Sequence, residues 1–126
     1  YKRWWRKFEF PRVPDKQPGI NRASLEKVEK FHDKHDFANK ENNGHDMSYR
    51  ILLTIEELGE LAECFTKGKS KHEKAEELAD ILILIFGHSI AMEVDLEEAF
   101  NKKMEIIMKR PAIKGDLGIR VTEYKK

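Results

Sequence analysis

The sequence has a single cysteine, Cys64, among its 126 residues, so no disulfide can form within the chain. A lone thiol is typical of a reducing compartment, which predicts an intracellular, cytoplasmic protein. Long apolar runs are also lacking. The longest, residues 81–92, is interrupted by His88 and falls short of the roughly 20 residues that span a bilayer. We therefore expect no membrane partner.

An excess of one charge is missing as well, because 24 basic and 23 acidic side chains leave a net charge of +1. The charges are nevertheless unevenly placed: residues 1–22 carry +5, residues 23–110 carry −6 and residues 111–126 carry +2. An acidic body disfavours nucleic-acid binding, since phosphate neutralisation supplies most of that affinity. The basic amino-terminal arm is an exception. Its Trp4 and Trp5 could stack on bases, or could cover an apolar groove on the body or on a second subunit.

Proline is scarce outside this arm, which contains three of the four prolines and is not expected to form a continuous helix. The fourth, Pro111, follows the last helical pattern, and no internal repeat or strand-rich region lies between. The sequence therefore divides into an extended basic and aromatic arm (residues 1–23), a helical domain (24–110) and a tail (111–126) expected to be a loop that can include a short strand.

Apolar residues in the middle of the chain recur at helical spacing, which predicts four helices. The first begins at an N-cap Ser24 and continues to Asn42, the second is capped by Asp46 or Ser48 and ends near Gly68, the third spans Lys71 to Met92, and the fourth begins at Asp95 and ends at Pro111. The second helix carries the clearest apolar stripe, which we expect to be buried: Ile51, Leu52, Ile55, Leu58, Ala62 and Phe65.

The third helix is apolar on every side between residues 81 and 86. A helix that is apolar all round is normally buried all round, and a chain of this size has few other elements to cover it. We therefore predict a homo-oligomer, either a homodimer or a homotetramer, built from an all-α four-helix bundle.

The second and third helices each carry two acids three residues apart, Glu57 with Glu60 and Glu77 with Asp80. Such residues lie on one face of a helix, so like charges there repel. Antiparallel packing would bring the four carboxylates into one cavity, where a cation must offset their repulsion. Carboxylate oxygens suit a hard ion such as Mg²⁺, which usually shares its ligands with substrate phosphates. The pattern thus indicates phosphate chemistry.

The alternative is that these acids belong to ordinary solvated helix faces, as most isolated acid pairs do. Two features favour a site. Both pairs adjoin the most apolar segments of their helices, where surface charges are less expected. Gly59 also interrupts the first pair, at a cost of about 1 kcal/mol in helix propensity relative to alanine, unless close packing or ligand access requires it.

The spacing of these acids is specific. Glu56-Glu57-x-x-Glu60, followed after 16 residues by Glu77-x-x-Asp80, resembles the EExxE…ExxD signature of the MazG-like all-α nucleotide pyrophosphohydrolases. The similarity covers residues 24–111 and is closest to the dCTP pyrophosphatase branch of that family. The segments that carry it are residues 57–63, 77–82 and 94–96, with Ala99, Lys103, Met104 and Arg110.

The resemblance implies an oligomeric four-helix bundle that uses Mg²⁺ to cleave a nucleoside triphosphate between its α and β phosphates. The products would be a nucleoside monophosphate and pyrophosphate, and the role nucleotide-pool housekeeping. It also implies that Glu57, Glu60, Glu77 and Asp80 are the Mg²⁺ ligands, with Mn²⁺ as a substitute. Glu57 is in addition the candidate general base. Glu56 either orients Glu57 or is a solvated neighbour.

Three further residues are candidates for substrate contact. Lys103 matches a lysine of the family's fourth helix, and Arg110 lies two turns further along the same face, so both could bind phosphate. Without the resemblance both would be taken for surface charges. His32 aligns with a histidine of the family's nucleotide pocket, although a histidine on an apolar stripe is also typical of a core. We expect His88 to be a core or interface residue and Cys64 to be a packed, unreactive thiol.

The sequence departs from the dCTP pyrophosphatase pattern at three base-contacting positions. Lys67 replaces a stacking tryptophan, Leu84 a tyrosine and Ile107 an asparagine, so a cytosine pocket is not expected to be intact. Trp4 or Trp5 could supply another stacking surface, an idea that an arm-deletion variant with unchanged substrate preference would refute.

Two other functions fit the same residues. A related helical enzyme could act on dUTP or phosphoribosyl-ATP, which a panel of nucleotides would distinguish. A non-catalytic helical oligomer could instead bind nucleotide or a protein partner, with the basic arm used for docking. Absence of pyrophosphate release, together with partner binding that survives loss of Glu60 or Asp80, would favour this last interpretation.

Overall fold

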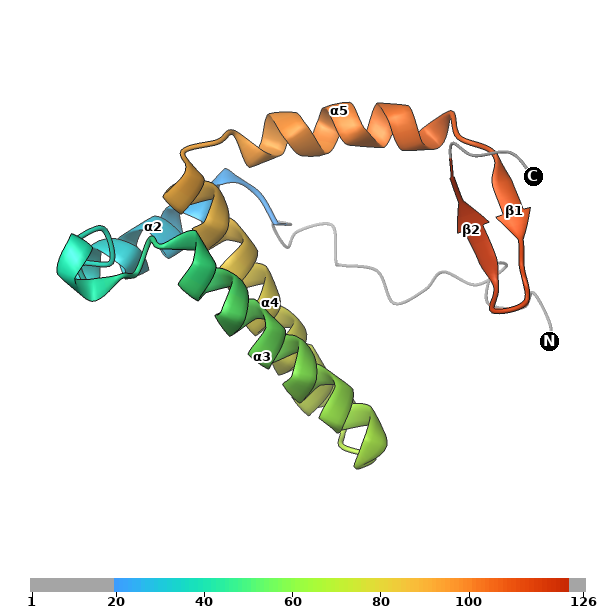
Figure 1. Cartoon of the computed structure of the whole chain (residues 1–126), viewed down its shortest axis with the longest axis horizontal. Helices are drawn as coiled ribbons and strands as arrows, with labels where there is room; N and C mark the ends of the chain where they lie inside the picture. Colours follow the sequence, from blue (N-terminus) through green and yellow to red (C-terminus); the bar gives the residue numbers. More distant parts are fainter. Residues whose placement is uncertain (1–19, 123–126) are drawn as a thin grey trace.

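The computed structural model describes residues 20–122, which are mostly helical, as predicted. Residues 1–19, including Trp4 and Trp5, and residues 123–126 lie outside the described part of the chain. The described elements follow one another along the chain in this order (Figure 1): α2 (Arg22–Lys34), the 3₁₀ turn η1 (Lys40–Asn42), α3 (Met47–Thr66), α4 (Lys71–Met92), α5 (Leu96–Met108), β1 (Ala112–Lys114) and β2 (Ile119–Val121).

Helices α3 and α4 form an antiparallel pair, and both agree with the predicted spans (Figure 1). Asp46, rather than Ser48, caps α3, since its carboxylate accepts the amide hydrogen of Tyr49 at 2.9 Å. The helix ends at Thr66, and Gly68 follows with a left-handed φ of 60° that glycine adopts without strain. The pair is the part of the fold that positions the acidic residues.

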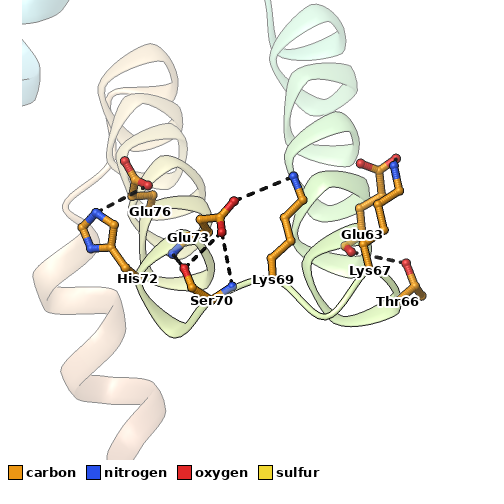
Figure 2. Close-up of polar contacts among 8 residues, drawn as sticks. All are labelled: Glu63, Thr66, Lys67, Lys69, Ser70, His72, Glu73 and Glu76. Carbon is orange, nitrogen blue, oxygen red and sulfur yellow. Dashed lines mark hydrogen bonds and ion pairs between the residues drawn. The ribbon is translucent and has the colours of Figure 1, made fainter.

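A short turn between α3 and α4 sets their antiparallel course (Figure 2). Ser70 and Glu73 form a capping box: Ser70 Oγ accepts the Glu73 amide at 3.1 Å, and Glu73 Oε1 accepts the Ser70 amide at 3.3 Å. Exposed ion pairs flank the turn, with Lys67 Nζ 3.6 Å from Glu63 and Lys69 Nζ 3.8 Å from Glu73. Exposed pairs contribute little stability, so the capping box and the left-handed Gly68 define the turn.

Helix α2 begins earlier than predicted. Its N-cap is Asn21, not Ser24, because the Asn21 side chain accepts the amide hydrogens of Ala23 at 2.9 Å and Ser24 at 3.4 Å. Ser24 occupies the third helical position and completes the capping box by accepting the Asn21 amide at 3.3 Å. Both residue types are good N-caps, so composition alone did not distinguish them.

Helix α2 also ends earlier than predicted, at Lys34 rather than Asn42. Asp36 adopts a left-handed φ of 53°, which stops the helix, and the Phe37 amide turns back to donate to the His32 carbonyl at 3.0 Å. Residues 35–46 then form turns around η1. This loop places Phe37 and His45 against the end of α2 and leads into α3.

Helix α5 begins as predicted, with Asp95 accepting the amide hydrogen of Glu98 at 3.0 Å, but it ends at Met108, before Pro111. It runs away from the α3/α4 pair, so a single chain does not close a four-helix bundle (Figure 1). The tail that follows forms an antiparallel hairpin in which Ala112 pairs with Val121.

The apolar stripe predicted on α3 is not buried within one chain. Its large members are between 47% and 62% exposed, whereas α3 turns Arg50 and Cys64 inward. Val28 and Cys64 are the buried apolar side chains of residues 20–122. Helices α3 and α4 therefore pack against each other through a partly polar face, and the most apolar face of α3 is left open. No helix in the described residues is long and apolar enough to cross a membrane.

Candidate metal centre

The predicted carboxylates converge between α3 and α4. One oxygen from each of Glu57, Glu60 and Glu77 lies within 4.8 Å of the others. Asp80, the fourth ligand predicted from the sequence, is not among these three; it is exposed, and its charge acts on Glu57. Glu57 and Glu77 are half-buried, while Glu60 is exposed at the edge of the group. The short antiparallel turn thus brings together two acid pairs separated by 16 residues of sequence.

The electrostatics of this group are those of crowded like charges. Burial raises the pKa of Glu57 from 4.5 to about 7, and contacts with Glu60 and Glu77 and the charge of Asp80 add to the rise. In addition, Glu57 Oε2 and Glu77 Oε2 are shielded from solvent and have no hydrogen-bond partner among the described residues. Buried acceptors without a donor are unfavourable, and the deficit is greater for a charged group.

These oxygens fit a divalent cation. Hard cations take carboxylate oxygens, and Mg²⁺ ligands at about 2.1 Å from the ion lie about 3–4 Å from one another, which is inside the 4.8 Å limit that holds for the three oxygens here. A cation would also supply the positive charge that the unpartnered atoms lack. Because a Cβ placed on Gly59 would meet no atom within 4 Å, packing inside the chain does not require this glycine. Ligand access beside the acids is the remaining reason for a glycine here, since the surface of α3 at Gly59 is open.

The other predicted site residues lie apart from this group within one chain. Glu56 is exposed on α3 and is not part of the cluster. Lys103 is exposed on α5, and Arg110 follows that helix, which leaves the α3/α4 pair. Arg110 Nε is nevertheless shielded from solvent and has no hydrogen-bond partner among residues 20–122.

His32 is buried and contacts a histidine that sequence reasoning missed. Its Nδ1 lies 2.8 Å from Nε2 of His45, in the loop before α3. Burial, together with the charge of Arg50 and the proximity of His45, lowers the pKa of His32 to about 4, so His32 is neutral at physiological pH. The position of His45 next to the N-cap of α3 was a signal that it could be held close to the helical body.

Both histidines line a cleft of about 410 Å³ that also contains Glu29, Asp33, Asp36, Ala38 and Ile90. None of the carboxylates of the α3/α4 group lines it. The structure therefore places His32 in a separate pocket from the predicted metal ligands.

The remaining predictions concern core residues. Cys64 is a buried free thiol, as expected. His88 lies between α3 and α4, where it contacts Arg50 and Thr54 of α3. Arg50 was missed from the sequence because it flanks the apolar stripe and has the appearance of an ordinary surface charge.

Comparison with known families agrees with the geometry. A family model described as the MazG nucleotide pyrophosphohydrolase domain matches residues 47–112, just over half of the chain. The matched segment begins at the first residue of α3 and ends in β1, so all four acids of the candidate centre lie within it. A search of curated proteins gives no significant match.

Proposed function

Because the chain belongs to the MazG nucleotide pyrophosphohydrolase family, we propose that it hydrolyses a nucleoside triphosphate between the α and β phosphates. The products are a nucleoside monophosphate and pyrophosphate, and the role is housekeeping of the nucleotide pool. One observation supports the proposal above all others: Glu57, Glu60 and Glu77 present oxygens within 4.8 Å of one another across two helices.

In this proposal Glu57, Glu60, Glu77 and Asp80 hold Mg²⁺, and Mn²⁺ can replace it. A bound divalent cation neutralises triphosphate charge and polarises the phosphoryl group. The unpartnered oxygens of Glu57 and Glu77 favour this assignment, since they are acceptors that the chain itself leaves without a donor. The exposed Glu60 and Asp80 lie on the side from which substrate can approach.

Glu57 is the proposed general base. A water oxygen attacks the α-phosphorus, the bond from that phosphorus to the bridging oxygen of the β-phosphate breaks, and Glu57 takes the proton of the water. A base works best when its pKa is near the working pH. Burial raises the pKa of Glu57 to about 7 in the metal-free chain, and a bound cation would lower it from there, which keeps the carboxylate able to accept a proton at neutral pH. Glu56, one residue earlier and exposed, is assigned the secondary role of orienting it.

Pyrophosphate release measured over a panel of triphosphates tests the function. The panel contains the canonical and modified nucleotides, with dCTP, dUTP and phosphoribosyl-ATP included. We expect release from at least one of them with Mg²⁺, none after chelation, and none from Asp80→Ala. If the folded protein releases no pyrophosphate from any member, the enzymatic proposal is wrong and a binding role for the helical scaffold is favoured.

We also propose that a second copy of the chain covers the open apolar face. The stripe on α3 is exposed, and α5 exposes further large side chains such as Phe100 and Ile106. Apolar area of this extent is normally covered in a soluble protein. Since α5 leaves its own α3/α4 pair, a second copy is also the proposed source of Lys103 and Arg110 at each acidic group.

Light scattering is expected to give a mass of at least two chains. Replacing Ile55 by aspartate should reduce the mass to that of one chain, because burying an unpaired carboxylate at the interface costs about 2 kcal/mol or more. Leu117→Asp is the matched control, since Leu117 is fully exposed in the β1–β2 loop. A wild-type monomer, or a dimer that tolerates Ile55→Asp, would contradict the proposed interface.

A further inference from the structure

A buried guanidinium connects the two helices that carry the acids. Arg50 is only 3% exposed, and none of the ion pairs among residues 20–122 involves it. Its three nitrogens donate in three directions: Nε to His88 Nδ1 at 3.0 Å, Nη1 to the Gly44 carbonyl at 2.8 Å, and Nη2 to the Leu84 carbonyl at 3.3 Å. A single side chain of α3 thus bonds to α4 and to the preceding loop.

His88 extends this arrangement into a closed ring of hydrogen bonds. The Thr54 hydroxyl donates its one hydrogen to the Arg50 carbonyl at 2.9 Å, so it must accept from His88 Nε2, which lies 2.8 Å away. His88 is therefore the neutral tautomer with hydrogen on Nε2, and its Nδ1 is free to accept from Arg50. Each ring nitrogen of His88 has one defined partner.

Gly87 makes room for the guanidinium. A Cβ at this position would overlap with Arg50 Nη2 and lie 2.8 Å from His32 Nε2. Glycine inside a helix costs about 1 kcal/mol relative to alanine, yet Gly87 is in the interior of α4. The close approach of Arg50 accounts for a glycine here.

The ring lies one helical turn from the acids on α3 and two turns on α4, where His88 follows Asp80 by eight residues and the Leu84 carbonyl, which accepts from Arg50, lies between them. Thr54 precedes Glu57 by three residues, and Leu84 follows Asp80 by four, so both pairs share a helix face. Between these faces the apolar stripe of α3 makes no contribution, because it is turned outward. Repulsion among the acids also pushes α3 and α4 apart. Directional bonds from Arg50 are well placed to fix their register.

We propose that Arg50, His88, Thr54 and Gly87 form a latch that holds α3 and α4 in the register at which their acids face one another. Arg50 touches none of those acids, so it is a positioning residue. The inference rests on the proposed function, because the register matters through the cation that the acids hold. Without the latch, part of the free energy of cation binding is used to bring α3 and α4 into the register at which the acids meet. Divalent cation affinity therefore falls, while the rate at saturating cation is retained.

The test compares two variants at position 88 and one variant at position 87 that adds a methyl group. His88→Gln keeps an acceptor for Arg50 and a donor for Thr54, whereas His88→Leu removes both. Gly87→Ala adds only a Cβ and raises helix propensity. Mn²⁺ binding to the metal-free full-length chain is measured from the electron paramagnetic resonance signal of free Mn²⁺, and circular dichroism checks that each variant is helical.

Groups hydrogen-bonded directly to metal ligands typically account for about 10–100-fold in metal affinity, and residues that act through the register of the two helices are expected to lie at the lower end of that range. We expect His88→Leu and Gly87→Ala to weaken Mn²⁺ binding by at least about tenfold, and His88→Gln to stay within about threefold of wild type. The Mg²⁺ concentration for half-maximal pyrophosphate release should rise by the same factor, with the rate at saturating Mg²⁺ unchanged.

Three results separate failure of the latch from failure of the proposed function. If wild type binds Mn²⁺ and releases pyrophosphate while His88→Leu and Gly87→Ala match it, the latch is overturned and the function stands. Equal losses of Mn²⁺ affinity in His88→Gln and His88→Leu also overturn the latch, since His88→Gln retains the hydrogen-bonding groups that His88→Leu lacks. If wild type neither binds Mn²⁺ nor releases pyrophosphate, the proposed function and the latch are both overturned.

Discussion

Replacing Glu77 by glutamine is expected to lower kcat/KM for pyrophosphate release by at least about a hundredfold, since even outer-shell partners of metal ligands are worth about 10–100-fold. Glu77 contributes a shielded oxygen that has no donor among the described residues, within 4.8 Å of oxygens of Glu57 and Glu60. The amide removes the charge that draws a cation while preserving the shape of the side chain. Steady-state kinetics over a range of Mg²⁺ concentrations measure the effect.

Glu76→Gln is the matched control. Glu76 is the preceding residue of α4, is exposed, and pairs with exposed His72 at 3.7 Å (Figure 2). Exposed pairs of this kind are worth about 1 kcal/mol or less, so activity should be unchanged. An active Glu77→Gln variant, or equal losses in the two variants, would remove Glu77 from the proposed centre.

Replacing Glu57 by glutamine is expected to stabilise the metal-free protein at alkaline pH while lowering activity. The folded-state pKa of Glu57, about 7, lies above its ordinary value of 4.5, so the folded chain binds the proton more tightly than the unfolded chain. The free energy of unfolding therefore falls as pH rises from 4.5 to 7, by about 1–3 kcal/mol after allowance for solvent screening. Glutamine carries no titrating proton and removes this loss.

Urea unfolding in a chelator at pH 5 and pH 8 measures the effect. Between pH 5 and pH 8, the free energy of unfolding of wild type should fall by more than that of Glu57→Gln. At pH 8 the variant should therefore regain about 1–3 kcal/mol relative to wild type. Glu63→Gln serves as the control, because Glu63 is exposed and forms its ion pair with Lys67 near the α3–α4 turn. Equal pH dependence in wild type and Glu57→Gln would show that Glu57 is not under the proposed repulsion.

The spans of α3 and α4 and the convergence of the acids could be predicted because they depend on local signals. Helical spacing, the Asp46 cap and a short turn near Gly68 together dictate an antiparallel pair. Acids three residues apart then share a face. No long-range information was needed to bring Glu57 and Glu77 together.

The faces that α3 presents could not be predicted in the same way. An apolar stripe indicates that something covers it, but it does not say whether the cover is the same chain. Here the stripe around Ile55 and Leu58 is left open, and the face toward α4 carries Arg50 and Thr54. A buried arginine has no periodic signature, because its partners are carbonyl groups and a histidine 38 residues away.

The remaining differences concern the start and the end of α2 and the contact between His32 and His45. Asn21 and Ser24 are both good caps, and the helix begins where the asparagine side chain reaches two amides. The end of α2 is set by the left-handed conformation of Asp36, which a helical spacing of apolar residues does not reveal. The sequence places His45 next to the N-cap of α3, but it does not show the contact with His32.

The most direct test of the central claim is where a paramagnetic cation binds. Substoichiometric Mn²⁺ added to isotope-labelled, metal-free protein broadens the amide signals of residues near the ion. The account predicts that signals of residues 57–60 and 77–80 are lost first, and that the acidic cleft of Glu29, Asp33 and Asp36 is affected later. Broadening centred on that cleft, or spread evenly along the exposed acids, would contradict a metal centre between α3 and α4.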